Sequence, residues 1–123
     1  MKWKDNFADG KEIILATCFE NKPNANIVIS LGFVDDKLLV ADCQMNDTIE
    51  NLKGNKNICV IGGYFRLIGK AEIFSSGKYF DLCVEKGKGY KVKHAILIEV
   101  KEIFDLEKVK RIEIPSLRIL INS

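Results

Sequence analysis

The sequence lacks the long apolar segments that membrane-spanning and secreted proteins carry. No stretch approaches the roughly 20 apolar residues that a membrane-spanning helix needs. The first residues, MKWKDNFADGK, also lack the uninterrupted apolar core of about 7–15 residues that marks a secretory signal peptide. We therefore expect a soluble, cytoplasmic protein with no membrane partner.

The sequence has almost no excess charge of either sign, with 19 basic residues, 17 acidic residues and a formal net charge of +2. Proteins that bind nucleic acid through its phosphates need a concentrated basic face, so we expect no nucleic-acid partner. Only the run KGKGYKVKH, at residues 86–94, is densely basic. A solvated loop is the simpler interpretation of this run, and a site for a phosphate or an acidic ligand is the alternative.

Metal-binding and nucleophilic residues are few and widely spaced. Cys18, Cys43, Cys59 and Cys83 are separated by 25, 16 and 24 residues, and His94 is the only histidine. Zinc sites and redox-active cysteine pairs depend on closely spaced ligands, so we expect reduced thiols, no disulfide and no metal site. A Ser-His-Asp machinery would depend on His94, which begins an apolar stretch and for which we expect a structural role.

Only two prolines interrupt the chain, and short turns separate apolar stretches rich in β-branched residues. These stretches predict six strands, at residues 12–19, 27–34, 37–42, 57–65, 66–74 and 94–106. Helices are predicted from about Asn46 to Gly54 and from Ser75 or Ser76 to Gly87, with a weaker helical turn near Trp3. The 123 residues, of which 47% are hydrophobic, suit a single domain. We expect a mainly β (α+β) fold, a small six-stranded split or closed β-barrel with one or two short helices, because closure removes exposed strand edges.

The mid-chain helix begins with residues that favour a helix start. Asn46, Asp47 and Thr48 are typical N-cap residues, and Asp47 followed by Glu50 fits the capping-box pattern. The free N–H groups and the positive dipole end of such a helix attract a phosphate. On these residues alone, an ordinary capped surface helix is the simpler alternative.

Four stretches in this order resemble the pyridoxamine 5′-phosphate oxidase-like, FMN-binding split-barrel superfamily. They are ATCFENKPNANIVIS, KLLVADCQMNDTIENLKGNKNICV with its Met-x-x-Thr-x-x-Asn helix start, FRLIGKAEIF with its Gly-x-Ala strand, and KHAILIEVKEIF. The resemblance covers residues 13 to about 104, most of the chain. Each motif is loose alone, and the ordered set is more specific than any of them.

The resemblance implies a homodimer with FMN in a cleft between the subunits, and it assigns three groups of residues to the cofactor. The isoalloxazine ring would lie along Ile27, Val28, Ile29 and Ser30. Its other side would be closed by Ala41, Asp42 and Cys43. The ribityl phosphate would be held by Asn46, Thr48 and Asn51.

Two positions depart from the family pattern. Many relatives carry a lysine where this chain has Asp47, and some carry an arginine where it has Ser30. A carboxylate about 5 Å from a phosphate costs roughly 3 kcal/mol per unit charge at an effective dielectric constant of about 20. Either Asp47 points away, or Lys53, Arg66, Lys70 or the basic loop 86–93 supplies the missing positive charge, or flavin binding is weak.

The function that the resemblance implies is that of a small flavin-dependent oxidoreductase, with the substrate and the electron donor unassigned. In such a protein the flavin carries the chemistry, and no side chain is required as an acid or a base. The alternatives are a non-catalytic flavin-binding module, or a superfamily member that uses F420, haem or a nitro compound. A structural dimer without a cofactor is a further alternative.

Overall fold

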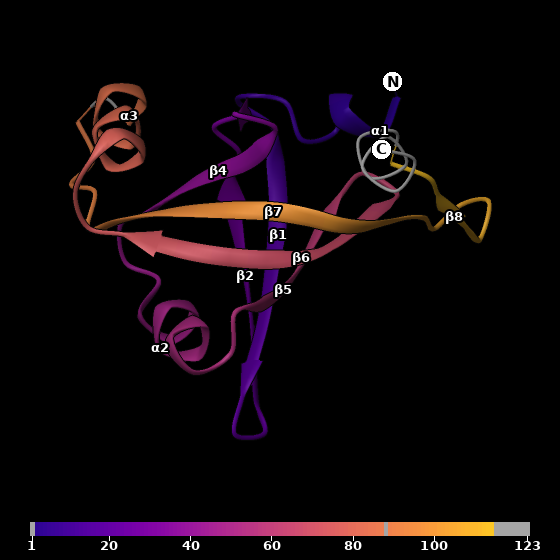
Figure 1. Ribbon diagram of the computed structural model, residues 1–123, viewed down its shortest axis with the longest axis horizontal. Helices are drawn as coiled ribbons and strands as arrows, with labels where there is room; N and C mark the ends of the chain where they lie inside the picture. Colours follow the sequence, from indigo (N-terminus) through magenta and orange to yellow (C-terminus); the bar gives the residue numbers. More distant parts are fainter. Residues whose placement is uncertain (1, 88, 115–123) are drawn as a thin grey trace, which may run out of the picture.

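The computed structural model describes residues 2–87 and 89–114. The described chain is mainly antiparallel β-sheet, with three short helices (Figure 1). Along the chain the elements are α1 (Lys2–Asp5), β1 (Glu12–Phe19), β2 (Lys22–Ile29), β3 (Phe33–Val34), β4 (Lys37–Asp42), α2 (Asn46–Gly54), β5 (Asn57–Gly62), β6 (Phe65–Phe74), α3 (Lys78–Lys86), β7 (His94–Asp105) and β8 (Lys110–Ile112).

The strands form one sheet in the order β2-β1-β5-β6-β7-β4-β3, and β8 pairs with β7. The sheet does not close into a barrel. The residues that follow β2, at one end of the sheet, nevertheless form hydrogen bonds with β4, near the other end. The backbone N–H of Leu31 donates to the carbonyl of Leu39 in β4, and the N–H of Leu39 donates to the carbonyl of Gly32, both at 2.9 Å. The predicted mainly β split barrel is therefore confirmed, with eight strands and three helices among the described residues where six strands and one or two helices were expected.

The first hairpin is tighter than the sequence suggests. The predicted strands at residues 12–19 and 27–34 leave residues 20–26 as a turn, but only Glu20 and Asn21 make it, both with positive φ (51° and 61°). This two-residue connection lets β2 begin at Lys22 and pair with β1 along its whole length. Because β2 is an end strand, Pro23 removes no hydrogen bond that a central strand would need.

The predicted strand over residues 27–34 is interrupted at Ser30. This side chain is buried, where its Oγ donates to the carbonyl of Phe7 at 2.7 Å and accepts from the N–H of Gly32 at 2.9 Å. Gly32 has a φ of +85°, which residues with a side chain rarely adopt. The chain therefore turns here, and the expected single strand becomes β2 and the two-residue β3.

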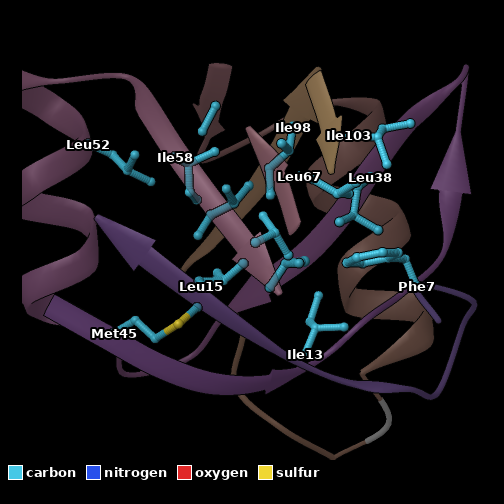
Figure 2. Packing of buried hydrophobic residues seen from close by; sticks show 14 of the residues in the cluster. Phe7, Ile13, Leu15, Leu38, Met45, Leu52, Ile58, Leu67, Ile98 and Ile103 are labelled. Atoms are coloured by element: carbon cyan, nitrogen blue, oxygen red, sulfur yellow. The ribbon is translucent and has the colours of Figure 1, made fainter. Parts of the chain in front are cut away.

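The main core lies inside the split barrel and follows the period-2 alternation of the strands. Figure 2 shows that Ile13 and Leu15 of β1, Leu38 of β4 and Leu67 of β6 all point into the same interior. A smaller cluster packs α3 against the other face of β4 and β7, and it centres on the buried side chain of Cys83. The two clusters hold the two faces of β4 in place, and β4 leads directly to the candidate site.

The ends of α3 differ from expectation in one respect. Its N-cap residue is Gly77, and no side chain caps it, so the predicted caps Ser75 and Ser76 were wrong. Its C-cap is Gly87, as the sequence predicted. No described helix is both long and apolar enough to cross a membrane.

The carboxy-terminal segment adds the short strand β8, which the sequence did not clearly predict. It pairs with the end of β7, where Phe104 is opposite Arg111. The run RILI, at residues 118–121, for which a last strand or a dimer contact was expected, lies outside the described residues.

Candidate cofactor site

An apolar hollow of about 490 Å³ lies between β2, the end of β4 and the carboxy end of α3, and we call it the apolar hollow. Its lining includes five of the ten predicted cofactor residues, drawn from two separate groups. They are Ile27, Val28, Ile29, Ala41 and Cys43. The hollow therefore brings together the two segments that the resemblance placed on opposite sides of a flavin ring.

The rim of the apolar hollow exposes large nonpolar side chains. Ile27 is 72% exposed, Ile29 is 50% exposed and Tyr90 is 76% exposed. Such side chains gathered around one hollow leave apolar surface in water that a ligand or another protein chain would cover.

Asp42 lies between two wall residues but faces the other side of the sheet, because successive side chains of a strand alternate. Its Oδ1 accepts a hydrogen bond from the N–H of Met45 at 2.6 Å, and its Oδ2 lies 2.6 Å from Nδ1 of His94. The hydroxyl of Ser30 is likewise committed inside the fold, so neither side chain lines the apolar hollow.

The start of α2 differs from the predicted cap. Its N-cap residue is Met45, and no side chain caps it, so the capping box of Asp47 and Glu50 was wrong. The nearest equivalent is the carboxylate of Asp42, which takes the N–H of Met45 itself. The sequence pattern misled because the polar residues lie one to three positions inside the helix.

Two of the three predicted phosphate ligands have no side-chain donor free for a phosphate. Thr48 is 1% exposed, and its hydroxyl donates to Oδ1 of Asn26 at 2.6 Å while accepting from Asn24 at 2.9 Å. Both N–H groups of the Asn51 amide are used, by Oγ1 of Thr17 and by the carbonyl of Lys22, each at 3.1 Å. Only Asn46, an exposed residue of the first turn, keeps a side chain directed to solvent.

A second hollow of about 400 Å³ lies beside α2 and the tip of the first hairpin, and we call it the acidic hollow. Its lining contains three carboxylates, those of Glu20, Asp47 and Glu50, and one ammonium group, that of Lys22. This charge balance opposes a phosphate in this hollow, which Asn51, one of the three predicted phosphate ligands, lines.

A third hollow, also about 400 Å³, adjoins the apolar hollow, with which it shares Cys43, Gln44 and Tyr90. Its remaining lining residues are Lys91 and Lys93, and we call it the basic hollow. The sequence showed the basic run 86–94 but not its location, because only the packing of α3 on β4 brings that loop to the cofactor segments. Tyr90 belongs to this run, whereas Leu31 and Gln44 carry no motif and were missed.

The thiol of Cys43 is the one titratable group among the five predicted residues that line the apolar hollow. Burial and the negative charge of Asp42 raise its pKa above the ordinary value of 9.0, so the group is neutral at physiological pH. It acts as part of the apolar wall. Within the part of the chain that the structure describes, no cluster of three or more histidine, cysteine or acidic residues is placed to hold a metal ion.

Comparison with known proteins finds similarity in structure only. No protein-family model matches the sequence, and no curated protein is similar to it in sequence. The HupZ protein of Group A Streptococcus is a solved structure with a TM-score of 0.79 and 23% identity, covering 91% of this chain and 97% of that chain.

Other solved structures carry names that match the sequence motifs. A protein from Lactobacillus delbrueckii assigned as a pyridoxamine 5′-phosphate oxidase has a TM-score of 0.65 and 17% identity, covering 76% of this chain and 83% of its own. An FMN-binding protein from Syntrophomonas wolfei has a TM-score of 0.60 and 15% identity, covering 83% of this chain and 77% of its own. An F420 reductase also matches. The resemblance seen in the motifs is thus confirmed at the level of the fold, and the chain has the split-barrel fold of the pyridoxamine 5′-phosphate oxidase-like proteins.

Proposed function

We propose that this protein binds a flavin cofactor, FMN, in the apolar hollow and acts as a small flavin-dependent oxidoreductase. The observation that carries the proposal is the meeting of Ile27, Val28 and Ile29 with Ala41 and Cys43 around one hollow of about 490 Å³. Sites for small organic ligands are typically concave, mostly apolar and about 300–1,000 Å³ in volume. The ring of a flavin therefore fits the walls that this chain provides.

The protein supplies binding, orientation and shielding from water, and FMN supplies hydride transfer when it is bound. As the end strand of the sheet, β2 has backbone N–H and C=O groups on one side without a strand partner, and these can bond the polar edge of a ring. Ile27 and Ile29 provide an apolar surface, and Cys43 is a neutral thiol in the facing wall. No acid or base is needed for hydride transfer, so the lack of a carboxylate in this lining is compatible with the proposal.

We further propose that the protein is a homodimer, in which a second copy covers the outer face of the sheet. Residues directly opposite each other in neighbouring strands share one face. The strand registers align one row across five strands, from β2 to β7, made up of Ile27, Ile14, Ile61, Arg66 and Phe104. Four of these five side chains are apolar, and none is fully buried.

Arg66 supports a covered face. Its guanidinium lies 5.0 Å from the ring centre of Phe104. Arginine and aromatic side chains are enriched at protein interfaces, so this pair within an otherwise apolar row suits a face that a second chain covers. Because Ile27 belongs both to this row and to the rim of the apolar hollow, the second copy would also help to enclose the cofactor.

The decisive experiment is the absorbance spectrum of the purified protein, with mass spectrometry of whatever small molecule it releases on denaturation. Flavin absorption bands and the mass of FMN support the proposal. The mass of F420 or of a haem would replace FMN with one of the other cofactors considered above. If the protein contains no chromophore and does not bind added FMN, riboflavin, F420 or haem, the cofactor proposal is wrong.

Catalysis is tested separately from binding. Anaerobic addition of NADH or NADPH to the flavin-loaded protein should bleach the flavin absorption if the protein is an oxidoreductase that uses either donor. The non-catalytic flavin-binding module is favoured if two results are obtained. Neither NADH nor NADPH reduces the bound flavin, and a nitro compound does not reoxidise flavin that dithionite has reduced.

A further inference from the structure

We propose that the anionic end of the ring-bearing ligand binds in the basic hollow, against Lys91 and Lys93, and not at the start of α2. This inference rests on the proposed function, because it takes the apolar hollow as the site of the ring. It gives the ligand a direction and a chemical class, that of a planar apolar molecule with a phosphate or carboxylate end.

The first step is the continuity of the two hollows. The apolar and basic hollows share Cys43, Gln44 and Tyr90, so a ligand with its ring against the β2 wall reaches the lysines without crossing the fold. The loop that carries Tyr90, Lys91 and Lys93 joins α3 to β7, next to the end of β4 (Figure 1). The N–H of Lys93 donates to the carbonyl of Asp42 at 2.8 Å, which fixes this loop to the same strand that provides the wall.

The second step is charge. Among the described residues that line the apolar and basic hollows, three are lysines and none is acidic. Lys86 is already paired with Asp9 at 2.8 Å, whereas no ion pair with a described residue is found for Lys91 or Lys93. Two ammonium groups with no paired carboxylate therefore face one end of the proposed site.

The third step is the contrast with α2. An anion at the acidic hollow would meet three carboxylates and one lysine, and the side-chain donors of Thr48 and Asn51 are already committed. The positive end of the helix dipole amounts to about half a charge, which does not offset three carboxylates. The departure at Asp47 accords with this contrast, since the acidic hollow holds three carboxylates whereas the lining of the basic hollow holds two lysines and no carboxylate.

Two matched ligands and two matched double variants test the inference. FMN and riboflavin share one ring system and differ by the phosphate. Lys91→Gln with Lys93→Gln removes the charge of the basic hollow, and Lys22→Gln with Lys53→Gln removes two lysines at and near the acidic hollow. Each variant is titrated with both ligands by flavin fluorescence, and its thermal unfolding is followed to confirm folding.

We expect the K91Q/K93Q variant to bind FMN about tenfold more weakly, the effect of losing two partly exposed ion pairs, and to bind riboflavin with unchanged affinity. The K22Q/K53Q variant should bind both ligands as the wild type does. The preference of the wild type for FMN over riboflavin should also shrink at high salt, and that salt dependence should disappear in K91Q/K93Q. Weakened FMN binding in K22Q/K53Q but not in K91Q/K93Q, or in neither variant, overturns the inference.

The inference can also be tested if the protein binds neither flavin, an outcome that removes the proposed function. The fluorescent anion 8-anilinonaphthalene-1-sulfonate and its uncharged analogue N-phenyl-1-naphthylamine then replace the flavins. A loss of about tenfold for the sulfonate alone in K91Q/K93Q retains the amphipathic anion site without a flavin. Equal affinities in wild type and variant rule it out.

Discussion

The Nδ1 atom of His94 lies 2.6 Å from Oδ2 of Asp42, and the side chain of Asp42 is 2% exposed. The other oxygen of the same carboxylate accepts the N–H of Met45, the residue before α2. One buried side chain thus connects β4, β7 and the start of α2. Since Ala41 and Cys43 are its neighbours in the chain, this connection holds the wall of the apolar hollow in position.

Replacing Asp42 should destabilise the fold because two donors lose their acceptor in a buried place. We expect Asp42→Ala to lower the free energy of unfolding by roughly 2–4 kcal/mol, and Asp42→Asn by less, because the amide oxygen still accepts from Met45. Urea denaturation measures both. Asp47→Ala is the matched control and should change stability by less than about 0.5 kcal/mol, since Asp47 is exposed and caps nothing. A loss of about 1 kcal/mol in the control would restore the capping box.

Thr48 should matter for stability and not for the cofactor. Its hydroxyl joins α2 to Asn24 and Asn26 of β2, so Thr48→Val should cost roughly 1–3 kcal/mol of unfolding free energy. The affinity for FMN, measured at a temperature where the variant is fully folded, should stay within about twofold of wild type because the hydroxyl has no donor left for a phosphate. FMN binding reduced about tenfold or more, with riboflavin unchanged, would place the phosphate at α2.

Most of the fold was predictable because its strands and helices follow local patterns of apolar, β-branched and turn-forming residues in the sequence. The β-branched, apolar run at residues 12–19 marked β1, and the apolar stretch from residue 94 marked β7, the longest described strand. The break at Ser30 was not predictable. It depends on a hydrogen bond to Phe7, 23 positions away, which no local pattern reveals.

Of the candidate site, only the walls that come from β2 and from β4 with the residue after it were predictable. The family resemblance identified Ile27, Val28, Ile29, Ala41 and Cys43, which the structure brings to one hollow. The phosphate end depends on which donors are already used and on which charges lie nearby. Both depend on the tertiary structure, which the motif at α2 does not encode.

Cys83 should make the protein less stable at alkaline pH. Burial raises the pKa of this thiol from 9.0 to about 11, so the folded state disfavours the thiolate that the unfolded chain forms more readily. The stabilisation is therefore complete below about pH 9 and is lost as the pH rises toward 11, by up to roughly 2–3 kcal/mol. Other groups titrate in this range, so the measured quantity is the difference in unfolding free energy between wild type and Cys83→Ala. That difference should move in favour of the variant from pH 8.5 to about 11, and a constant difference would contradict the prediction.

Ile14 should control assembly without touching the cofactor. It lies between Ile27 and Ile61 in the apolar row on the outer face of the sheet and does not line the apolar hollow. A carboxylate placed there would be buried unpaired if a second copy covers the face, so Ile14→Asp should raise the dimer dissociation constant roughly 30-fold or more. Sedimentation equilibrium at tens of micromolar, where an interface of standard size persists, measures this change.

Tyr64→Asp is the control, because Tyr64 is an exposed aromatic residue in the turn between β5 and β6 and should leave assembly unchanged. Wild-type protein that is monomeric in this range, or an Ile14→Asp variant that dimerises as tightly as wild type, would show that this face is not the interface.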